Sequence, residues 1–269
     1  MKKQLAWLLV CALVFSLCAC GRQTPPQQTT TEPAPNTVWV TFPEGKTVLQ
    51  IADLLQENGV CSAADFLRAV AESDSDYAAA LRGQDRPFLL EGYVFPDTYE
   101  FYKNESASMA LSRFLNNMRQ KFSADKQARA AELGMTMDEV LTLASIIQAE
   151  ASVPAEMPKV SAVLHNRLQR GMKLQCDVTY FYLEKTVMPC LCPDGWDDDV
   201  YEKYADLYYT YRIDGLPLGP ICNPGSDAIA AALEPADTDD LYFVTDADGN
   251  YYYSETYEAH QKICAEIGR

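Results

Sequence analysis

One carboxylate, Glu150, lies within the apolar stripe of a predicted helix. Thr136 followed three residues later by Glu139 is the pattern of a capping box, so we expect a helix to begin there. From that start the apolar side chains recur at helical spacing, at Val140, Leu143, Ala144 and Ile147. At about 100° per residue, Glu150 projects close to the direction of Leu143, whereas Gln148 points to roughly the opposite face.

A carboxylate in this position costs free energy unless it is paired, neutralised or faces a cavity. Pro154 predicts that the helix ends by about Val153, which places Glu150 in the last turn, where the helix dipole disfavours a negative charge. Burial and the dipole should both raise the pKa of Glu150, which is how a general acid is made. A helix-end side chain that reaches solvent, or a buried ion pair, would explain the same pattern.

The first residues of the chain have the features of an export signal. Lys2 and Lys3 precede an apolar run over residues 5–19, which is too short for a comfortable membrane span of about 20 residues. The run ends Leu17-Cys-Ala-Cys-Gly21, which resembles a bacterial lipobox. Residues 1–19 are therefore expected to be a lipoprotein signal peptide, with lipid on Cys20 anchoring the chain at the extracytoplasmic face of the cell membrane. An uncleaved N-terminal anchor is the alternative, and both place the remainder outside the cytoplasm.

Composition sets the class of the remaining chain and excludes some partners. Residues 20–36 are rich in Thr, Pro and Gln without apolar periodicity, which predicts a disordered tether. The folded part begins at about residue 37. The formal net charge of −16 argues against nucleic acid and acidic lipid surfaces as partners, because both are negatively charged.

Six cysteines remain after the N-terminal segment, and they need sorting by chemistry. They are Cys61, Cys176, Cys190, Cys192, Cys222 and Cys264. An even number outside the cytoplasm permits disulfides, whose pairing cannot be deduced from sequence. Cys190 and Cys192 are too close together for the usual zinc pair. We expect disulfides or free thiols, and neither a metal site nor a cofactor.

The folded part divides into two predicted regions. Residues 38–42 alternate like a strand, residues 48–55 form an amphipathic helix that closes at Asn58-Gly59, and Ser62 is placed to cap a second helix. These elements predict a small strand–helix–helix module over residues 37–83. The main domain would then cover residues 84–269.

The main domain is predicted to be mainly helical with small β elements, an α+β fold class. Further helices are expected over residues 106–122, with Met109 on the inner side, and over 157–170 and 228–233, and residues 172–182 are expected to pass from a loop into a helix. Residues 186–207 are rich in aspartate and are expected to be irregular. Residues 241–245 and 251–253 predict a hairpin whose acidic turn lacks the glutamate of a calcium loop.

Five stretches resemble, in order and spacing, the endolytic murein transglycosylase (YceG-like) family. They are Leu90-Glu-Gly-Tyr-Val-Phe-Pro-Asp-Thr-Tyr-Glu-Phe101, Leu143-Ala-Ser-Ile-Ile-Gln-Ala-Glu150, residues 163–179, residues 211–225, and the ending from Tyr242-Phe-Val to His260. The resemblance covers roughly residues 38–265. It likens the module over residues 37–83 to a LysM unit.

The resemblance implies a lytic murein transglycosylase, a carbon–oxygen lyase that cuts peptidoglycan glycan strands internally and leaves 1,6-anhydro-N-acetylmuramic acid ends. In the family, the catalytic acid is the second acidic position of an Ala-Ser-Ile-Ile-Glu-x-Glu block, which is Glu150 here. One carboxylate suffices, because the C6 hydroxyl of the muramic acid is the nucleophile and no second group must activate water. Such an enzyme terminates glycan chains during cell-wall assembly, and the family also suggests association with peptidoglycan synthases.

The resemblance also implies positions that bind the substrate. Asn166, Gln175 and Asp177 match polar family positions and are expected to line the sugar cleft, although Asn166 and Asp177 could equally cap or turn the chain. Glu91 and Tyr211 are further candidates with structural alternatives. A structural role is the safer interpretation of His260.

Three positions depart from the family pattern. The first acidic position of the block is Gln148, a family asparagine is Tyr209, and a family histidine is Tyr251. Two other hypotheses therefore stay open. One is a non-catalytic peptidoglycan-binding lipoprotein of the same fold. The other is a glycosidase that uses water, with Asp177 as its second carboxylate.

Overall fold

The structure, a computed structural model, describes residues 36–269. The predicted signal peptide, lipidation at Cys20 and the tether up to residue 35 lie outside the described residues. Among residues 36–269, every helix is too short or too polar to cross a bilayer.

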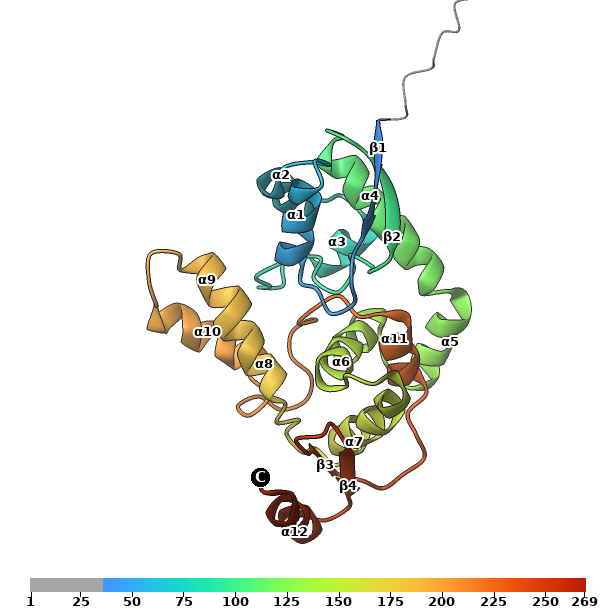
Figure 1. The fold of residues 1–269 in the computed structure, drawn as a ribbon, viewed down its shortest axis with the longest axis vertical. Helices are drawn as coiled ribbons and strands as arrows, with labels where there is room; N and C mark the ends of the chain where they lie inside the picture. Colours follow the sequence, from blue (N-terminus) through green and yellow to red (C-terminus); the bar gives the residue numbers. More distant parts are fainter. Residues whose placement is uncertain (1–35) are drawn as a thin grey trace, which may run out of the picture. The chain divides into compact units, whose positions relative to one another are not determined.

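The first described elements build a two-stranded sheet against helices (Figure 1). They are β1 (Thr37–Thr41), α1 (Val48–Glu57), α2 (Ala63–Ala71), α3 (Asp76–Leu81), β2 (Thr98–Tyr102) and α4 (Ala107–Lys121). The predicted strand and both predicted helices are confirmed, with a capping box at Thr47 and a side-chain cap at Ser62. Strands β1 and β2 are antiparallel, with Thr37 opposite Tyr102.

An aromatic cluster joins the sheet to α4. The ring of Phe42 lies 4.9 Å from that of Phe114 and 6.0 Å from that of Phe101, in edge-to-face geometry. The prediction of Met109 on the inner side of α4 is wrong, because its side chain is 52% exposed. Ala110 and Leu111, which follow it, take the buried positions.

Strand β1 takes its partner from outside the predicted module. Strand β2 lies beyond residue 83, and residues 36–269 cluster as one unit. The boundary at residue 83 stays a prediction.

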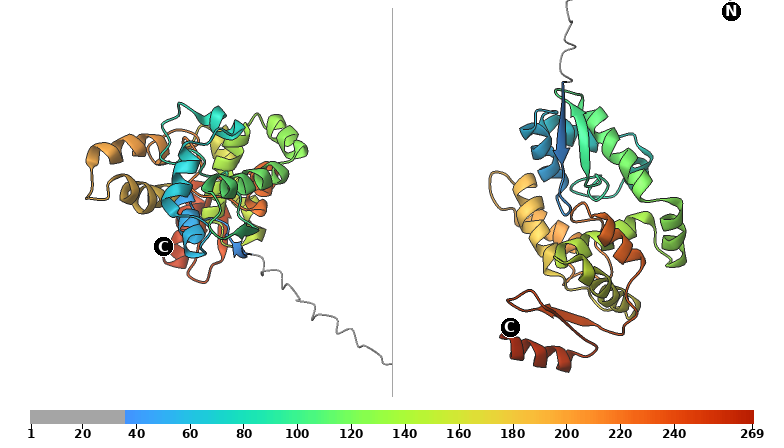
Figure 2. Two further views of the ribbon diagram at one scale, coloured as in Figure 1. Left: turned by 90° about the horizontal axis from the view of Figure 1, so that it is seen from above. Right: turned by 45° about the vertical axis from the view of Figure 1, so that its right-hand side comes forward.

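The remaining elements include one buried helix, α6. They are α5 (Ala124–Glu132), α6 (Met137–Glu150), α7 (Met157–Gln169), α8 (Asp177–Tyr182), α9 (Met188–Leu191), α10 (Asp198–Tyr208), α11 (Ser226–Leu233), β3 (Tyr242–Thr245), β4 (Tyr251–Ser254) and α12 (Tyr257–Ile267). The predicted capping box of Thr136 and Glu139 is present, and every residue from 140 to 147 is buried. Helices α7 and α11 pack on α6 (Figure 2).

Helices α8, α9 and α10 form an arm that projects beside this core (Figures 1 and 2). The expectation that residues 186–207 are irregular is wrong, since they hold α9 and most of α10. Asp197 caps α10 by accepting hydrogen bonds from the amides of Asp199 and Val200, and the aspartates of the first turn suit the helix dipole. The aspartates therefore begin a helix.

Two small sheets within a mainly helical chain confirm the coarse fold class. The hairpin of β3 and β4 is also confirmed, and Asp246 in its turn accepts hydrogen bonds from the amides of Asp248 and Asn250. Helix α12, which follows the hairpin, was not predicted.

Residues 219–225 connect the first elements to α6. The Asn223 side chain accepts a hydrogen bond from the Val94 amide at 2.9 Å and donates to the Lys46 carbonyl at 2.9 Å and to Glu91 Oε1 at 2.8 Å. Glu91 Oε1 also accepts from the Val48 amide. Burial raises the pKa of Glu91 to about 8.

Replacing Glu91 by Gln should flatten the pH dependence of stability. Between pH 4.5 and 8 the folded chain keeps a proton on Glu91 that the unfolded chain releases. The wild-type free energy of unfolding should therefore fall as pH rises through this window, by roughly 1 kcal/mol per pH unit. Urea unfolding at several pH values measures the slope. The slope should be smaller in Glu91→Gln and unchanged in Glu72→Gln, whose side chain is exposed; equal slopes in all three proteins would contradict the prediction.

Candidate active site

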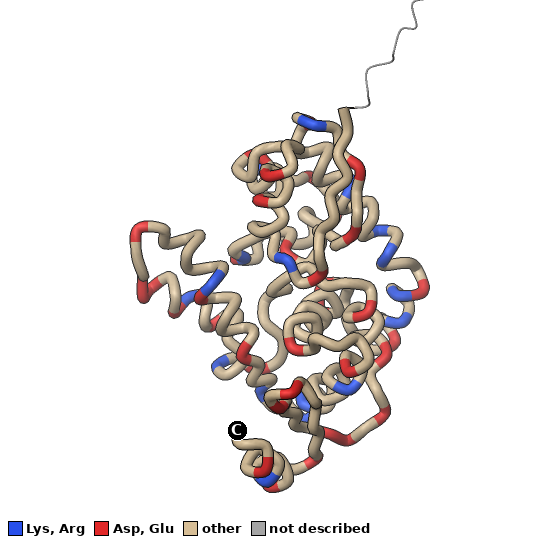
Figure 3. Tube along the Cα trace, viewed as in Figure 1, with Lys and Arg blue, Asp and Glu red and all other residues tan. Residues whose placement is uncertain are grey.

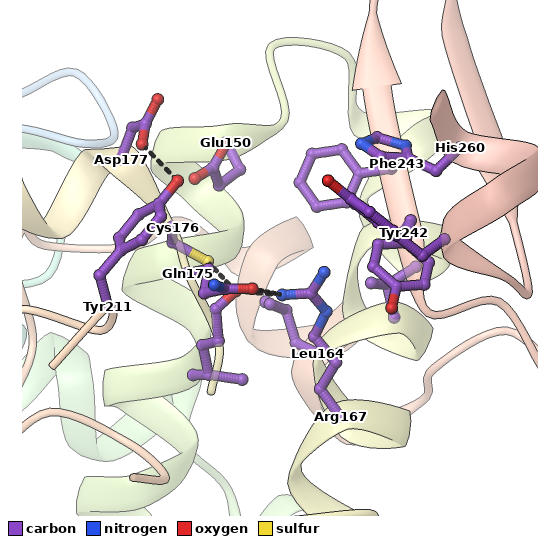
Figure 4. Close-up of a pocket in the computed structure, with 13 residues that line it drawn as sticks. Glu150, Leu164, Arg167, Gln175, Cys176, Asp177, Tyr211, Tyr242, Phe243 and His260 are labelled. Carbon is purple, nitrogen blue, oxygen red and sulfur yellow. Dashed lines mark hydrogen bonds between the residues drawn. The ribbon is translucent and has the colours of Figure 1, made fainter. Parts of the chain in front are cut away.

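A pocket of about 430 Å³ lies between the first turn of α8 and the β3–β4 hairpin (Figure 4). Its lining side chains come from α6, α7, the loop before α8, the first residue of α8, the segment after α10, β3 and α12. They are Glu150, Val163, Leu164, Arg167, Leu174, Gln175, Cys176, Asp177, Tyr211, Tyr242, Phe243, Tyr257 and His260.

Glu150 is the last residue of α6 and points into this pocket (Figure 4). Burial, and next the charge of Asp177, raise the pKa of Glu150 to about 7. The Val178 amide and the Cys176 thiol favour the carboxylate and oppose that rise. The predicted direction and the role of burial are confirmed, and the nearby charge that adds to burial is that of Asp177.

Tyr251 fixes the end of α6. Its hydroxyl donates to the Glu150 carbonyl at 3.2 Å and accepts from the Ser152 amide at 3.1 Å. Gln148 turns away from the pocket and accepts a hydrogen bond from the Gly225 amide at 2.9 Å. Tyr251 and Gln148, two of the three departures from the family pattern, thus form hydrogen bonds with backbone groups and lie outside the pocket lining.

The start of α8 and the segment after α10 bring Asp177 and Tyr211 together beside Glu150 (Figure 4). The Tyr211 hydroxyl donates to Asp177 Oδ1 at 2.8 Å (Figure 4). Gln175 has a φ of 54°, a left-handed conformation that is uncommon for a residue with a side chain. The backbone amide of Gln175 donates to the Thr210 carbonyl at 3.2 Å. This hydrogen bond joins the loop before α8 to the segment that carries Tyr211.

Arg167 connects the two sides of the pocket and is not among the residues predicted from the sequence. Its guanidinium donates to the carbonyls of Leu241 at 2.6 Å and Leu174 at 2.9 Å, and lies 5.0 Å from the Tyr242 ring. It also donates to Gln175 Oε1 at 3.3 Å. The sequence does indicate a buried arginine here, because Arg167 continues the helical spacing of Val160, Val163 and Leu164 on the buried face of α7.

His260 closes the pocket from α12. Its ring stacks on Tyr242 at 5.3 Å, and Nε2 lies 3.6 Å from the Cys264 sulfur. Burial and the charge of Arg167 lower its pKa, which favours the neutral ring. Its buried Nδ1 has no hydrogen-bond partner within residues 36–269, and the ring faces the pocket.

Glu91 and Asn166 are not brought to the pocket. Glu91 is in the core beneath α1, as described above. The Asn166 side-chain amide donates to the carbonyls of Thr238 and Asp240, so its role is structural, through distant carbonyls and not through a cap or a local turn. The geometry therefore supports pocket roles for Glu150, Gln175, Asp177 and Tyr211, and gives none to the other two.

The cysteines of residues 36–269 are all unpaired, and this part of the chain holds no group of three or more His, Cys, Asp or Glu that could bind a metal ion. Glu150 and Asp177 are the carboxylates that line the pocket. Because the pKa of Glu150 lies near neutrality while Asp177 accepts a hydrogen bond, the pocket is suited to proton transfer by one carboxyl group.

Comparison with known proteins agrees with the predicted resemblance. A family model described as the YceG-like family matches residues 23–266. The chain is 31% identical to the endolytic murein transglycosylase of Bacillus subtilis over 176 residues, 64% of this chain, and 27% identical to that of Streptococcus pneumoniae over 250 residues, 84% of this chain. A crystal structure of a yceG-like protein from Listeria monocytogenes superposes with a TM-score of 0.70 at 28% identity, covering 84% of this chain and 75% of that one.

The chain matches about half the length of these two curated relatives, 46% and 44% respectively.

Replacing Arg167 by Lys should destabilise the pocket. Lysine cannot reproduce the fork that binds the Leu241 and Leu174 carbonyls together, so buried acceptors lose their donors. We expect a loss of about 2–4 kcal/mol in the free energy of unfolding, measured by urea denaturation. Arg170→Lys, an exposed position at the end of the same helix, is the control. A loss no larger than that of the control would show that Arg167 does not hold the two sides together.

Proposed function

The chain belongs to the YceG-like family, and from this membership and the pocket geometry we propose that it is a lytic murein transglycosylase, a lyase that cleaves peptidoglycan glycan strands. The observation that carries the proposal is Glu150, a carboxyl group at a helix end inside a pocket, with its pKa raised to about 7. The relatives named endolytic murein transglycosylase support the same activity.

A protonated Glu150 can supply both proton transfers of the reaction. It first donates its proton to the glycosidic oxygen as the bond from that oxygen to C1 of N-acetylmuramic acid breaks. The C6 hydroxyl of the same sugar then forms the new bond to C1 and gives its proton to the Glu150 carboxylate. No water is consumed, Glu150 is regenerated, and the product carries a 1,6-anhydro end.

Asp177 and Tyr211 support this chemistry from beside Glu150. The charge of Asp177 helps keep the proton on Glu150, as a general acid that operates near neutral pH requires. The hydrogen bond from Tyr211 fixes the position of that charge. Gln175, which is exposed beside them, is placed to hydrogen-bond sugar hydroxyl or acetamido groups.

The setting of the enzyme is part of the proposal. The lipobox-like residues that end at Cys20 and Gly21 support a lipid anchor at the extracytoplasmic face of the membrane. Cleavage there would end growing glycan chains, in association with peptidoglycan synthases. The order of β1, α1 and α2 supports likening residues 37–83 to a LysM unit.

Replacing Glu150 by Gln should abolish cleavage, because the amide cannot donate the proton. We expect the rate on purified glycan strands to fall by about 10²- to 10⁴-fold. Mass spectrometry of strands digested by the full chain should find 1,6-anhydro ends with the wild type and none with the variant. Reducing ends would indicate a glycosidase that uses water. Intact strands that remain bound would indicate a non-catalytic binding protein.

Replacing Asp177 by Asn should move the pH profile of kcat/KM. Wild-type activity needs protonated Glu150, so it should decline as pH rises through about 7. Asparagine removes the negative charge but can still accept the Tyr211 hydrogen bond, so the pKa of Glu150 should fall and the decline should begin at lower pH. Asp248→Asn, in the exposed hairpin turn, should leave the profile unchanged. A decline at the same pH in all three proteins would exclude this role for Asp177.

A further inference from the structure

The segment after α10 exposes two tyrosines on one side. Tyr208 and Thr210 are buried, and the side chains of Tyr209 and Tyr211 alternate with them. Thr210 fixes this alternation, because its hydroxyl accepts a hydrogen bond from the Cys176 amide at 2.9 Å. Tyr211 lines the pocket, whereas Tyr209 lies outside its lining.

Helix α8 continues the aromatic surface away from the pocket. Tyr180 and Phe181 lie on its outer face, while Tyr182 is buried on the other side. The ring centroids of Tyr211 and Tyr209 are 5.3 Å apart, those of Tyr209 and Tyr180 are 5.6 Å apart, and those of Tyr180 and Phe181 are 6.0 Å apart. The four rings therefore form one continuous surface, the aromatic wall, that begins beside Glu150.

The ends of the wall are exposed, and two of its rings, those of Tyr211 and Tyr180, are held by hydrogen bonds. Tyr211 is 41% and Phe181 is 43% exposed. The hydroxyl of Tyr211 donates to Asp177, and that of Tyr180 donates to Glu184 one turn further along the arm. Rings that are already oriented lose little conformational freedom when a ligand stacks on them.

We propose that the aromatic wall binds sugar rings of the glycan strand beyond the pocket, on the arm side of Glu150. The inference rests on the proposed function, since a strand cut internally must extend past the cleaved bond. The occupant fits the surface, because pyranose rings present apolar C–H faces to aromatic rings while their hydroxyl groups stay hydrated. Acidic and basic residues both occur along the arm (Figure 3). The arm therefore has no continuous stretch of one charge, whereas its aromatic rings are continuous.

Binding by strands of different length tests the wall. The full chain carries Glu150→Gln throughout, so that strands stay intact, and Tyr209→Leu and Tyr180→Leu are added singly. The ligands are peptide-free glycan strands of many disaccharides and a tetrasaccharide of the same sugars. We expect each leucine variant to bind the long strands about five- to tenfold more weakly, with little change for the tetrasaccharide.

Two further variants separate stacking from folding. Tyr209→Phe keeps the ring and should retain the affinity for long strands. Tyr102→Leu, an exposed tyrosine of β2, should bind both ligands like its parent. Loss of affinity in Tyr209→Phe as well would assign the effect to structure and overturn the proposal.

The remaining outcomes distinguish the wall from the enzyme. Long strands bound equally well by the leucine variants and their parent would overturn the wall and leave the proposed function standing. Equal loss for the tetrasaccharide would also overturn it, because the rings would then belong to the pocket. Length-dependent loss, together with a wild-type chain that binds strands without cutting them, would support the wall and remove the proposed activity.

Discussion

The hydrogen bonds of Asn223 join the two halves of the described chain, and the position of Glu150 depends on them. One side chain bonds to Lys46, Glu91 and Val94, all from the first half. Neighbouring residues of its segment then bind α6, since the Ile221 amide donates to the Ser145 hydroxyl and the Gly225 amide to Gln148. The segment passes so close to Gly92 that a Cβ there would lie 2.4 Å from Pro220. A buried polar network of this kind stabilises one arrangement because each unpaired group would cost free energy.

Helix α6 serves the core and the pocket with different parts of its length. Residues 140–147 are buried between α7 and α11, and the helix leaves the core only at its last turn. Glu150 lies in that last turn. Its surroundings are still buried enough to raise its pKa, and its carboxyl group faces the pocket, where a substrate could accept the proton. One turn earlier the carboxylate would be enclosed, and beyond Ala151 it would be off the helix. The apolar residues that stabilise α6 therefore also set the acidity of its final side chain.

The parts of the site that could be predicted are those with local causes. The capping box and the apolar period locate α6, and the position of Glu150 in that period predicts its raised pKa. Glu91 and Asn166 were assigned to the cleft because a sequence does not show which distant partner satisfies a polar side chain; that of Glu91 is 132 residues away. Helix α10 was not predicted because a surface helix rich in aspartate has only a weak apolar period. The local feature that marks it is its N-terminal cap, Asp197.

The role of the second carboxylate of the pocket, Asp177, distinguishes the two kinds of glycan cleavage. A glycosidase that uses water needs a base or nucleophile whose oxygens are free to act on water or on the sugar. Asp177 already accepts a hydrogen bond from Tyr211 on one oxygen, and its charge acts on Glu150 by making that group harder to ionise. The effect of this charge suits an auxiliary that keeps a single acid protonated, while the hydrogen bond from Tyr211 occupies only Oδ1 of Asp177. On the proposed mechanism this asymmetry is sufficient, because the substrate supplies its own nucleophile and the protein has only to hold one proton near the glycosidic oxygen.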